Sequence, residues 1–259
     1  MPEPAPPRIA WMLNKVQEVT VAFWVIKIMS TTVGETGADY LAVHVGLGTA
    51  TTGGIMAILL AAALAAQMRA QRYVPWIYWL TVVLVSVVGT QITDALTDRL
   101  DVSLYASTAA FATALAATFA VWYAVERTLS IHSITTTRRE AFYWTAILFT
   151  FALGTAAGDL ATEALGLGFN VGVLAFGGLI AAVYAAYRMG LNAVLAFWLA
   201  YILTRPLGAS LGDLLSQAQT YGGLGLGTVV TSLAFLAVIV ALVTVLSLRM
   251  VRAQSADGA

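Results

Sequence analysis

The stretch FWVIKIMSTTVGETGAD, residues 23–39, contains a tryptophan, a glycine ten residues later and an aspartate five residues after that. Three later stretches keep both spacings, and in all four an aromatic residue directly precedes the tryptophan. The four sets are Trp24, Gly34 and Asp39; Trp79, Gly89 and Asp94; Trp144, Gly154 and Asp159; and Trp198, Gly208 and Asp213. Because a fixed spacing repeated along a chain indicates repeated structural units, we interpret the protein as four copies of one unit.

The composition is that of a membrane protein. The chain has 259 residues, of which 60% are hydrophobic and 10% charged, and its mean hydropathy is +0.85. A soluble domain usually has about a quarter charged residues. Apolar runs of about 20 residues recur and favour membrane-spanning helices. The net charge of zero argues against nucleic acid as a partner, and the absence of cysteine excludes disulfides and thiolate metal ligands.

The predicted fold is all-α: a polytopic membrane helix bundle with eight transmembrane helices from four parallel two-helix repeats. The expected spans are 17–41, 48–67, 74–97, 103–125, 141–165, 170–188, 191–217 and 223–248. We expect a lead-in at 1–14, repeats at 15–72, 73–126, 141–190 and 191–252, a linker at 127–140 and a tail at 253–259. The polar linker separates two four-helix halves.

Basic residues in the loops predict the orientation. Ten of them fall on one side of the expected spans and only Arg99 on the other. The ten are Arg8, Lys15, Arg69, Arg72, Arg127, Arg138, Arg139, Arg188, Arg249 and Arg252. Both termini are therefore expected in the cytoplasm. Since each repeat has two spans, all four copies point the same way, and their first helices can surround a central axis with quasi-fourfold or paired twofold symmetry.

Polar residues follow a four-residue spacing on the first helix of each repeat, which places them on one helix face. This polar ridge includes Lys27, Thr31, Glu35 and Asp39; Ser86, Thr90, Asp94 and Asp98; Thr155, Asp159 and Glu163; and Tyr201, Arg205 and Asp213. A charge in mid-membrane costs at least about 2.5–3.5 kcal/mol on insertion scales. We therefore expect the ridges to face one another, and the second helices to form the lipid-facing layer.

The repeated aspartates form the candidate ion site. Asp39, Asp94, Asp159 and Asp213 occupy equivalent positions, with Glu35 and Glu163 near them in the sequence. Carboxylate oxygens suit Mn²⁺, Mg²⁺ or Ca²⁺, so a divalent cation is the expected ligand of this set. The alternative interpretation is structural, with the aspartates capping helix ends or bonding to neighbouring helices. For the tryptophans, an aromatic belt at the membrane interface is the default expectation.

Two cations interrupt the repeat symmetry. Lys27 lies in the first span, and Arg205 lies in the seventh, directly before Pro206, which is expected to kink that helix or open its hydrogen-bond ladder. Both need counter-charges, which we expect from the outer carboxylates, and for Lys27 from a neighbouring repeat rather than from Glu35. A lysine in an apolar environment can lose its proton near neutral pH, so Lys27 is also the candidate proton carrier.

The segment EVTVAFWVIKIMSTTVGETGADYL, residues 18–41, resembles the signature of a bacterial membrane-anchored protein family built from several copies of a repeat of unknown function. The resemblance covers most of the chain and implies an integral protein of the bacterial inner membrane with four repeats. It implies no substrate. Lys27 and Glu35 have no counterparts in the later copies, so a mechanism that needs them has one such pair per chain.

The leading functional prediction is a transporter of a small cation, proton-coupled, with Mn²⁺ as the first candidate. Arg205 is unfavourable for a simple cation pore and leaves a small anion or polar metabolite open. The alternative is an intramembrane enzyme or ligand-binding sensor that uses the same polar core, including a retinal-type Schiff base on Lys27. A structural subunit is a third alternative. The sequence also leaves a homodimer open, in which two chains close one pathway.

Overall fold

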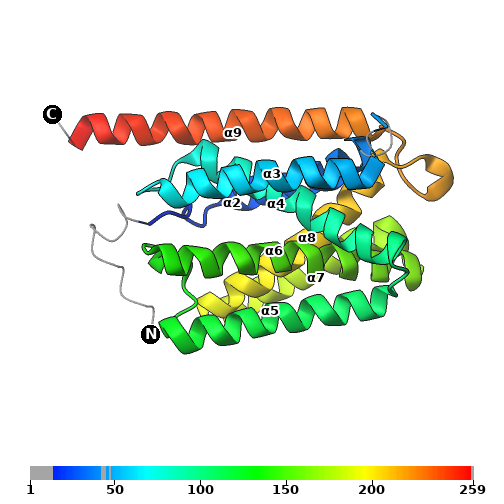
Figure 1. Ribbon diagram of the computed structural model, residues 1–259, viewed down its shortest axis with the longest axis horizontal. Coiled ribbons are helices and arrows are strands. Elements are labelled where there is room, and N and C mark those ends of the chain that lie inside the picture. Colours follow the sequence, from blue (N-terminus) through cyan, green and yellow to red (C-terminus); the bar gives the residue numbers. More distant parts are fainter. Residues whose placement is uncertain (1–13, 42–44, 47, 258–259) are drawn as a thin grey trace.

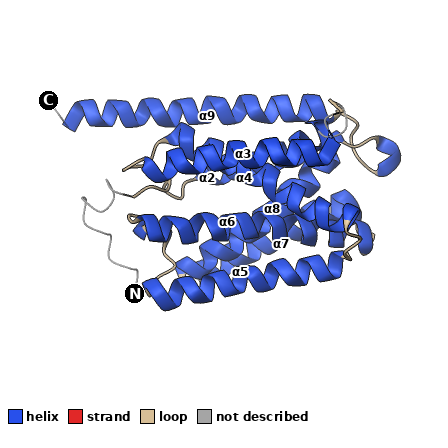
Figure 2. Ribbon diagram, viewed as in Figure 1, coloured by secondary structure: helices blue, strands red, loops and turns tan. Residues whose placement is uncertain are grey.

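The computed structural model describes residues 14–41, 45–46 and 48–257, and within them every regular element is helical (Figures 1 and 2). Most of the expected lead-in, 1–13, therefore lies outside the described residues. The α-helices are α2 (Val21–Asp39), α3 (Gly48–Arg69), α4 (Pro75–Asp94), α5 (Leu104–Glu126), α6 (Thr137–Asp159), α7 (Gly168–Arg188), α8 (Ala193–Ser216) and α9 (Thr228–Asp257). They correspond one to one to the eight expected spans.

Seven of the described helices, α3 to α9, are long and apolar enough to cross a membrane. Helix α2 differs because its apolar part covers only Val21–Gly34. This stretch stops before Glu35, whose side chain lies outside the described residues. The eighth expected span is thus present as a helix, but its hydropathy does not by itself identify it as a membrane span.

The helices form an inner ring and an outer layer. The first helices of the repeats, α2, α4, α6 and α8, pack side by side in that order, and α8 closes the ring by packing on α2. Each second helix packs on the first helix of the following repeat: α3 on α4, α5 on α6, α7 on α8, and α9 on α2. All first helices run in the same direction in Figure 1. The arrangement is quasi-fourfold, and the second helices lie outside as predicted.

The repeated glycines fix the register of the ring. A Cβ atom added to any of them would overlap a neighbouring side chain, and that neighbour is always the residue seven positions after the tryptophan of the following repeat. The four contacts are Gly34 with Ser86, Gly89 with Phe151, Gly154 with Arg205, and Gly208 with Thr31. Small residues allow helix backbones to approach closely in a bilayer. The same glycine therefore makes the same contact around the whole ring.

Hydroxyl groups bridge three of the ring interfaces at these close approaches. Each donates a hydrogen bond to a backbone carbonyl of the neighbouring helix. The bonds are Ser86 Oγ to Thr31 O at 3.4 Å, Thr93 Oγ1 to Ala152 O at 3.1 Å, and Thr32 Oγ1 to Gly208 O at 2.8 Å. Where lipid replaces water, such bonds satisfy polar groups that would otherwise be costly to bury.

The tryptophans do not form a belt facing lipid. Trp79, Trp144 and Trp198 are buried in the core, where they pack against Tyr78 and Tyr143 from the preceding positions. The interface-belt expectation is wrong for these three residues. Four aromatic pairs placed at one level of a closed ring face one another and fill its interior, and this packing buries the rings more completely than an interface position would.

Candidate ion site on the ring axis

The polar ridges of the four repeats are buried between the ring helices. They form layers at three, seven and eleven residues after each tryptophan, and every described side chain in them is buried. The first layer holds Lys27, Val82, Ile147 and Tyr201; the second Thr31, Ser86, Phe151 and Arg205; and the described part of the third Thr90, Thr155 and Ala209. Thr31, Ser86, Thr90 and Thr155 are all buried between the ring helices, and their part in an ion site stays a prediction.

Lys27 lies at the centre of this ridge, with only 1% of its surface exposed. Its Nζ atom donates a hydrogen bond to Thr31 Oγ1 at 3.3 Å. It also lies 4.1 Å from the ring centroid of Phe151 and 4.4 Å from that of Tyr201. Aromatic faces attract an ammonium group through the negative side of their quadrupole. Among the described side chains no carboxylate pairs with Lys27, and its described partners are two rings and one hydroxyl.

Arg205 is completely buried and extends across the ring. Its Nη2 atom donates hydrogen bonds to Thr90 Oγ1 on α4 and to Thr155 Oγ1 on α6, the second at 2.7 Å. The guanidinium carbon lies 5.8 Å from the centroid of the Phe151 ring that Lys27 also contacts. The two cations of the chain's apolar core are therefore held around one phenylalanine, with hydroxyl groups from three repeats.

The hydroxyl groups around these cations have a fixed polarity. Thr31 donates to Lys27 O at 2.9 Å, Thr90 to Ser86 O at 3.1 Å, and Thr155 to Phe151 O at 3.2 Å. Since each hydroxyl hydrogen is bonded to the preceding turn of its own helix, each oxygen presents lone pairs to the axis. The site therefore offers acceptors to a cation, and Lys27 and Arg205 use them.

The aspartates lie beyond this layer, at the other end of the ring helices. Asp94 and Asp159 end α4 and α6, Asp213 lies in the last turn of α8, and all three are partly buried. Eight residues separate each aspartate from the second layer, which corresponds to about 12 Å along a helix. Asp94 and Asp159 are followed directly by π-helical turns, Ala95–Arg99 and Leu160–Ala164. Such turns occur often at functional sites.

The four-aspartate metal site stays a prediction. Within the described part of the chain, no three His, Asp or Glu side chains lie close enough to hold a metal ion together. The side chains of Glu35, Asp39, Asp98 and Glu163 lie outside the described residues, although their backbones belong to α2 or to the turns after α4 and α6. The described geometry thus supports a polar axis with cations and hydroxyls at its centre and carboxylates at one end.

The opposite end of the axis is closed by the segment Asn14–Gln17, which precedes α2. Gln17 Oε1 accepts hydrogen bonds from Tyr73 Oη at 2.6 Å and from Trp79 Nε1 at 2.5 Å. Burial raises the pKa of Tyr73 well above its ordinary value, so its hydroxyl stays a donor. Beneath Gln17, the hydroxyls of Tyr78 and Tyr143 hydrogen-bond to each other at 2.6 Å. An aromatic layer and one buried amide therefore seal this end.

A buried ion pair anchors the same segment. Lys15 Nζ lies 2.8 Å from Glu140 Oε2 and also donates to Met68 O at 3.1 Å. Gln67 Nε2 donates to Glu140 Oε1 at 3.1 Å and to Lys15 O at 3.3 Å. Glu140, the last residue of the expected polar linker, is 1% exposed and therefore belongs to the packed bundle. It lies in the first turn of α6. At such a position a polar residue is expected to belong to a solvated loop, unless its partner, here Lys15, is known.

Sequence reasoning missed two parts of the site. Phe151, the aromatic residue between both cations, is absent from the predicted polar ridge because its side chain is apolar. Gln17 and Glu140 lie at the ends of the expected spans, where a polar residue carries no signal of burial. For Phe151 a signal was present, because it lies seven residues after Trp144, as Thr31 and Arg205 lie seven after theirs.

The comparisons with known proteins agree with the repeat pattern. A family model described as a Repeat of Unknown Function (DUF347) matches the chain four times, at residues 22–73, 77–128, 142–189 and 196–251. Each match contains one ring helix and most or all of the outer helix that follows it. No curated protein and no solved structure matches the chain significantly.

Proposed function

Since the chain belongs to the DUF347 family, whose description names no activity, we propose from the site itself that the protein is an integral membrane transporter that exchanges a small cation for protons. Mn²⁺ is the first candidate, followed by Mg²⁺ and Ca²⁺. The single observation that carries the proposal is a buried lysine on the axis of a four-repeat ring, held by rings and a hydroxyl instead of by a carboxylate among the described residues.

Lys27 is the exchange group in this proposal. Its ammonium occupies the acceptors and aromatic faces that a passing cation would also use, so the two compete for one place. When Lys27 releases its proton, the Thr31 oxygen and the faces of Phe151 and Tyr201 become available to another cation. When the proton returns, like-charge repulsion expels that cation. Competition of this kind couples movement of the cation to movement of a proton in the opposite direction.

The carboxylates collect the cation at the entrance. Asp94, Asp159 and Asp213, with Asp39 and Glu35 from the first repeat, lie in the helix segments beyond the central layer. Negative charge at a mouth with apolar walls raises the local concentration of cations. Pro206 lies inside α8, next to Arg205, and Gly158 of α6 faces it. We assign the joint that moves during transport to this contact, because proline removes one hydrogen bond from the helix ladder.

We further propose that all eight helices span the bacterial inner membrane with both termini in the cytoplasm. The described basic residues of the loops, Arg99 excepted, lie at the end of the bundle that is closed by Asn14–Gln17, and cytoplasmic loops carry such an excess. The aspartate end then faces outward. In this proposal, Gln17 and the aromatic layer beneath it close the cytoplasmic end of the pathway.

The test is ion flux in proteoliposomes. Mn²⁺, Mg²⁺ and Ca²⁺ uptake and proton release are measured with the wild type, Asp159→Asn, Asp213→Asn and Lys27→Met. We expect at least tenfold slower flux in both aspartate variants. In Lys27→Met we expect cation movement to lose its coupling to protons and its dependence on pH. Asp101→Asn is the matched control, because Asp101 is exposed in a loop and its left-handed backbone suits asparagine.

Two results would contradict the proposal. Folded wild-type protein that moves none of these ions under any gradient is not a cation transporter. Equal loss of flux in Asp101→Asn and Asp159→Asn would show that the intramembrane aspartates have no special part.

A small anion or polar solute is the second candidate substrate, favoured by the position of Arg205 and Lys27 around the same Phe151 ring. Two cations in neighbouring layers around one ring would bind a carboxylate or phosphate group more readily than a divalent cation. The same liposomes distinguish the two candidates. Counterflow of phosphate or a small carboxylate that depends on Arg205 and is insensitive to Asp159→Asn would favour the anion.

A further inference from the structure

A groove of about 600 Å³ runs along the outside of the bundle between α5 and α8. Apolar side chains form its two walls and its floor; they are Ala112, Leu115, Ala116 and Phe119 from α5, Leu195, Leu199 and Ile202 from α8, and Leu153 and Trp198 beneath. It exists because α5 packs on α6 and its walls contain small residues, Ala112 and Ala116. The groove therefore faces the surroundings of the bundle and reaches down to the ring helices.

Polar groups line only one end of the groove. Arg127, Thr128 and Asn192 lie there, at the end of the bundle that carries the linker. Asn192 Oδ1 accepts hydrogen bonds from Val194 N and Leu195 N as the cap of α8, so its side-chain NH₂ group is the donor left for a ligand. Thr128 Oγ1 accepts from Ser130 N, and its hydroxyl hydrogen is likewise available. This end of the groove presents donors.

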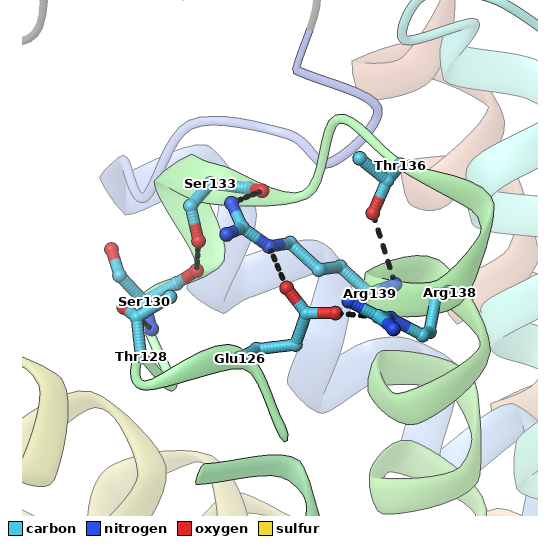
Figure 3. Close-up of polar contacts among 7 residues, drawn as sticks. All are labelled: Glu126, Thr128, Ser130, Ser133, Thr136, Arg138 and Arg139. Carbon is cyan, nitrogen blue, oxygen red and sulfur yellow. Dashed lines mark hydrogen bonds and ion pairs between the residues drawn. The ribbon is translucent and has the colours of Figure 1, made fainter. Parts of the chain in front are cut away.

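Arg127 gives this end its positive charge. The adjacent carboxylate, Glu126, is held by Arg139 Nε at 2.7 Å and by Arg138 Nε (Figure 3). These contacts, together with the hydrogen bond from Arg139 Nη1 to Ser133 O, direct Glu126 toward the linker (Figure 3). Arg127 is exposed and has no ion-pair partner among the described residues. Glu126 thus pairs with two of the three arginines in this region, and the third, Arg127, lies at the groove.

The length of the groove matches one leaflet of a bilayer. From Ala112 to Tyr123, both of which line it, α5 rises by eleven residues, or about 16 Å. The hydrocarbon core of a bilayer is about 30 Å thick, so the apolar part covers about half of it. Arg127 directly follows the last residue of the candidate span Leu104–Glu126, which in a bilayer would place it at the level of the lipid headgroups.

We propose that this groove is a binding site for an anionic phospholipid of the leaflet on the linker side. The phosphate lies between the Arg127 guanidinium and the donors of Thr128 and Asn192, and one acyl chain fills the groove along Ala116. Guanidinium and phosphate form paired hydrogen bonds, and an anionic lipid is favoured because its phosphate charge is not already balanced by a cation in its own headgroup. Since the acyl chain contacts Trp198, the lipid supports a ring helix directly.

The test is lipid-dependent stability and binding of the purified protein. Thermal unfolding and native mass spectrometry are compared for detergent-solubilised protein with phosphatidylglycerol, with phosphatidylcholine of the same acyl chains, and with inorganic phosphate. We expect phosphatidylglycerol to raise Tm and to remain bound, and the other two to have at most half of that effect. This readout is independent of transport, so the lipid site and the proposed function fail separately.

Two pairs of variants locate the site. Arg127→Gln removes the charge, and Ala116→Trp fills the groove. Each variant should reduce the rise in Tm by at least half. Arg249→Gln is the control for an exposed arginine elsewhere, and Ala120→Trp is the control for bulk on an exposed position of α5 outside the groove. An unchanged response in Arg127→Gln, or equal responses to both lipids, would overturn the proposal. So would an equal response to free phosphate.

Discussion

At Gly154 the ring leaves no room for a side chain. A Cβ atom there would overlap Arg205 at Cβ and Cγ, close to the backbone of α8, and would lie 3.2 Å from Pro206 Cδ. These atoms cannot rotate away as the end of a long side chain can. The contact between α6 and α8 that brings Arg205 to Thr155 therefore requires a glycine at this position.

We expect Gly154→Ala to lower the free energy of unfolding by about 1–3 kcal/mol, the usual cost of overpacking. Thermal unfolding in detergent measures the loss. Gly178→Ala in α7 is the control, because a Cβ there meets nothing within 4 Å and alanine favours helix by up to about 1 kcal/mol over glycine. A Tm that falls equally in both variants would contradict the close contact.

Lys27→Met is expected to leave Tm unchanged or to raise it. Methionine is similar in length to the lysine side chain, and replacing a buried charge by an apolar group of similar volume is often neutral or stabilising. Lys27 makes one hydrogen bond and two ring contacts, and methionine keeps favourable contacts with aromatic rings. Unchanged stability together with altered flux would assign Lys27 to function. A fall in Tm as large as that of Gly154→Ala would assign it to structure.

At the scale of elements, the segment before α2 is part of the bundle. Its backbone exchanges hydrogen bonds with Ile134 O in the linker and with Tyr73 N before α4, in addition to the side-chain contacts of Lys15 and Gln17. A short stretch without regular structure thus joins the first repeat, the loop after α3 and the start of α6. It covers the end of the ring that lies opposite the aspartates.

The Lys15–Glu140 pair gives a double-mutant test of this element. Lys15→Met leaves a buried carboxylate without its cation, and the expected loss is about 3–5 kcal/mol. Glu140→Gln should lose a comparable amount. The double variant should lose less than the sum of the two, because it removes both charges; chemical or thermal unfolding measures the coupling. Additive losses would mean that the two charges do not interact in the folded protein.

The elements were largely predictable from sequence, and the contacts between them less so. The eight expected spans correspond to α2–α9 because long apolar runs limit where a helix can end in lipid. The burial of Thr31, Thr90 and Thr155 followed from their four-residue spacing. The partners of Lys27 could not be predicted, since a search for counter-charges selects carboxylates and overlooks the faces of Phe151 and Tyr201. The burial of Glu140 could not be predicted, because the cation that pairs with it lies 125 residues away in the sequence.

At the scale of the whole molecule, the bundle closes where its last helix packs on its first. Helix α9 packs on α2, and Thr36 Oγ1 lies 2.6 Å from Ser232 Oγ across that interface. The closure joins residues separated by most of the chain. It gives α2 an outer neighbour of its own.

The closure can be tested by a disulfide, because the chain contains no cysteine of its own. Thr36→Cys with Ser232→Cys should cross-link efficiently under mild oxidation, since the replaced oxygens are within disulfide reach. Altered mobility on a denaturing gel, reversed by reductant, measures the bond. Thr36→Cys with Thr244→Cys is the control, because Thr244 lies twelve residues further along α9, about 18 Å away. Equal cross-linking of both pairs would contradict the packing of α9 on α2.

The common direction of the four ring helices limits how such a protein can work. In transporters built from inverted repeats, two halves exchange conformations, and the inward-open state becomes the mirror of the outward-open state. Here no such exchange is available, because rotating one repeat onto the next turns the ring about its axis and leaves its two ends distinct. In the proposed transporter, each mouth must therefore open by its own mechanism, and inward and outward transport would require different movements.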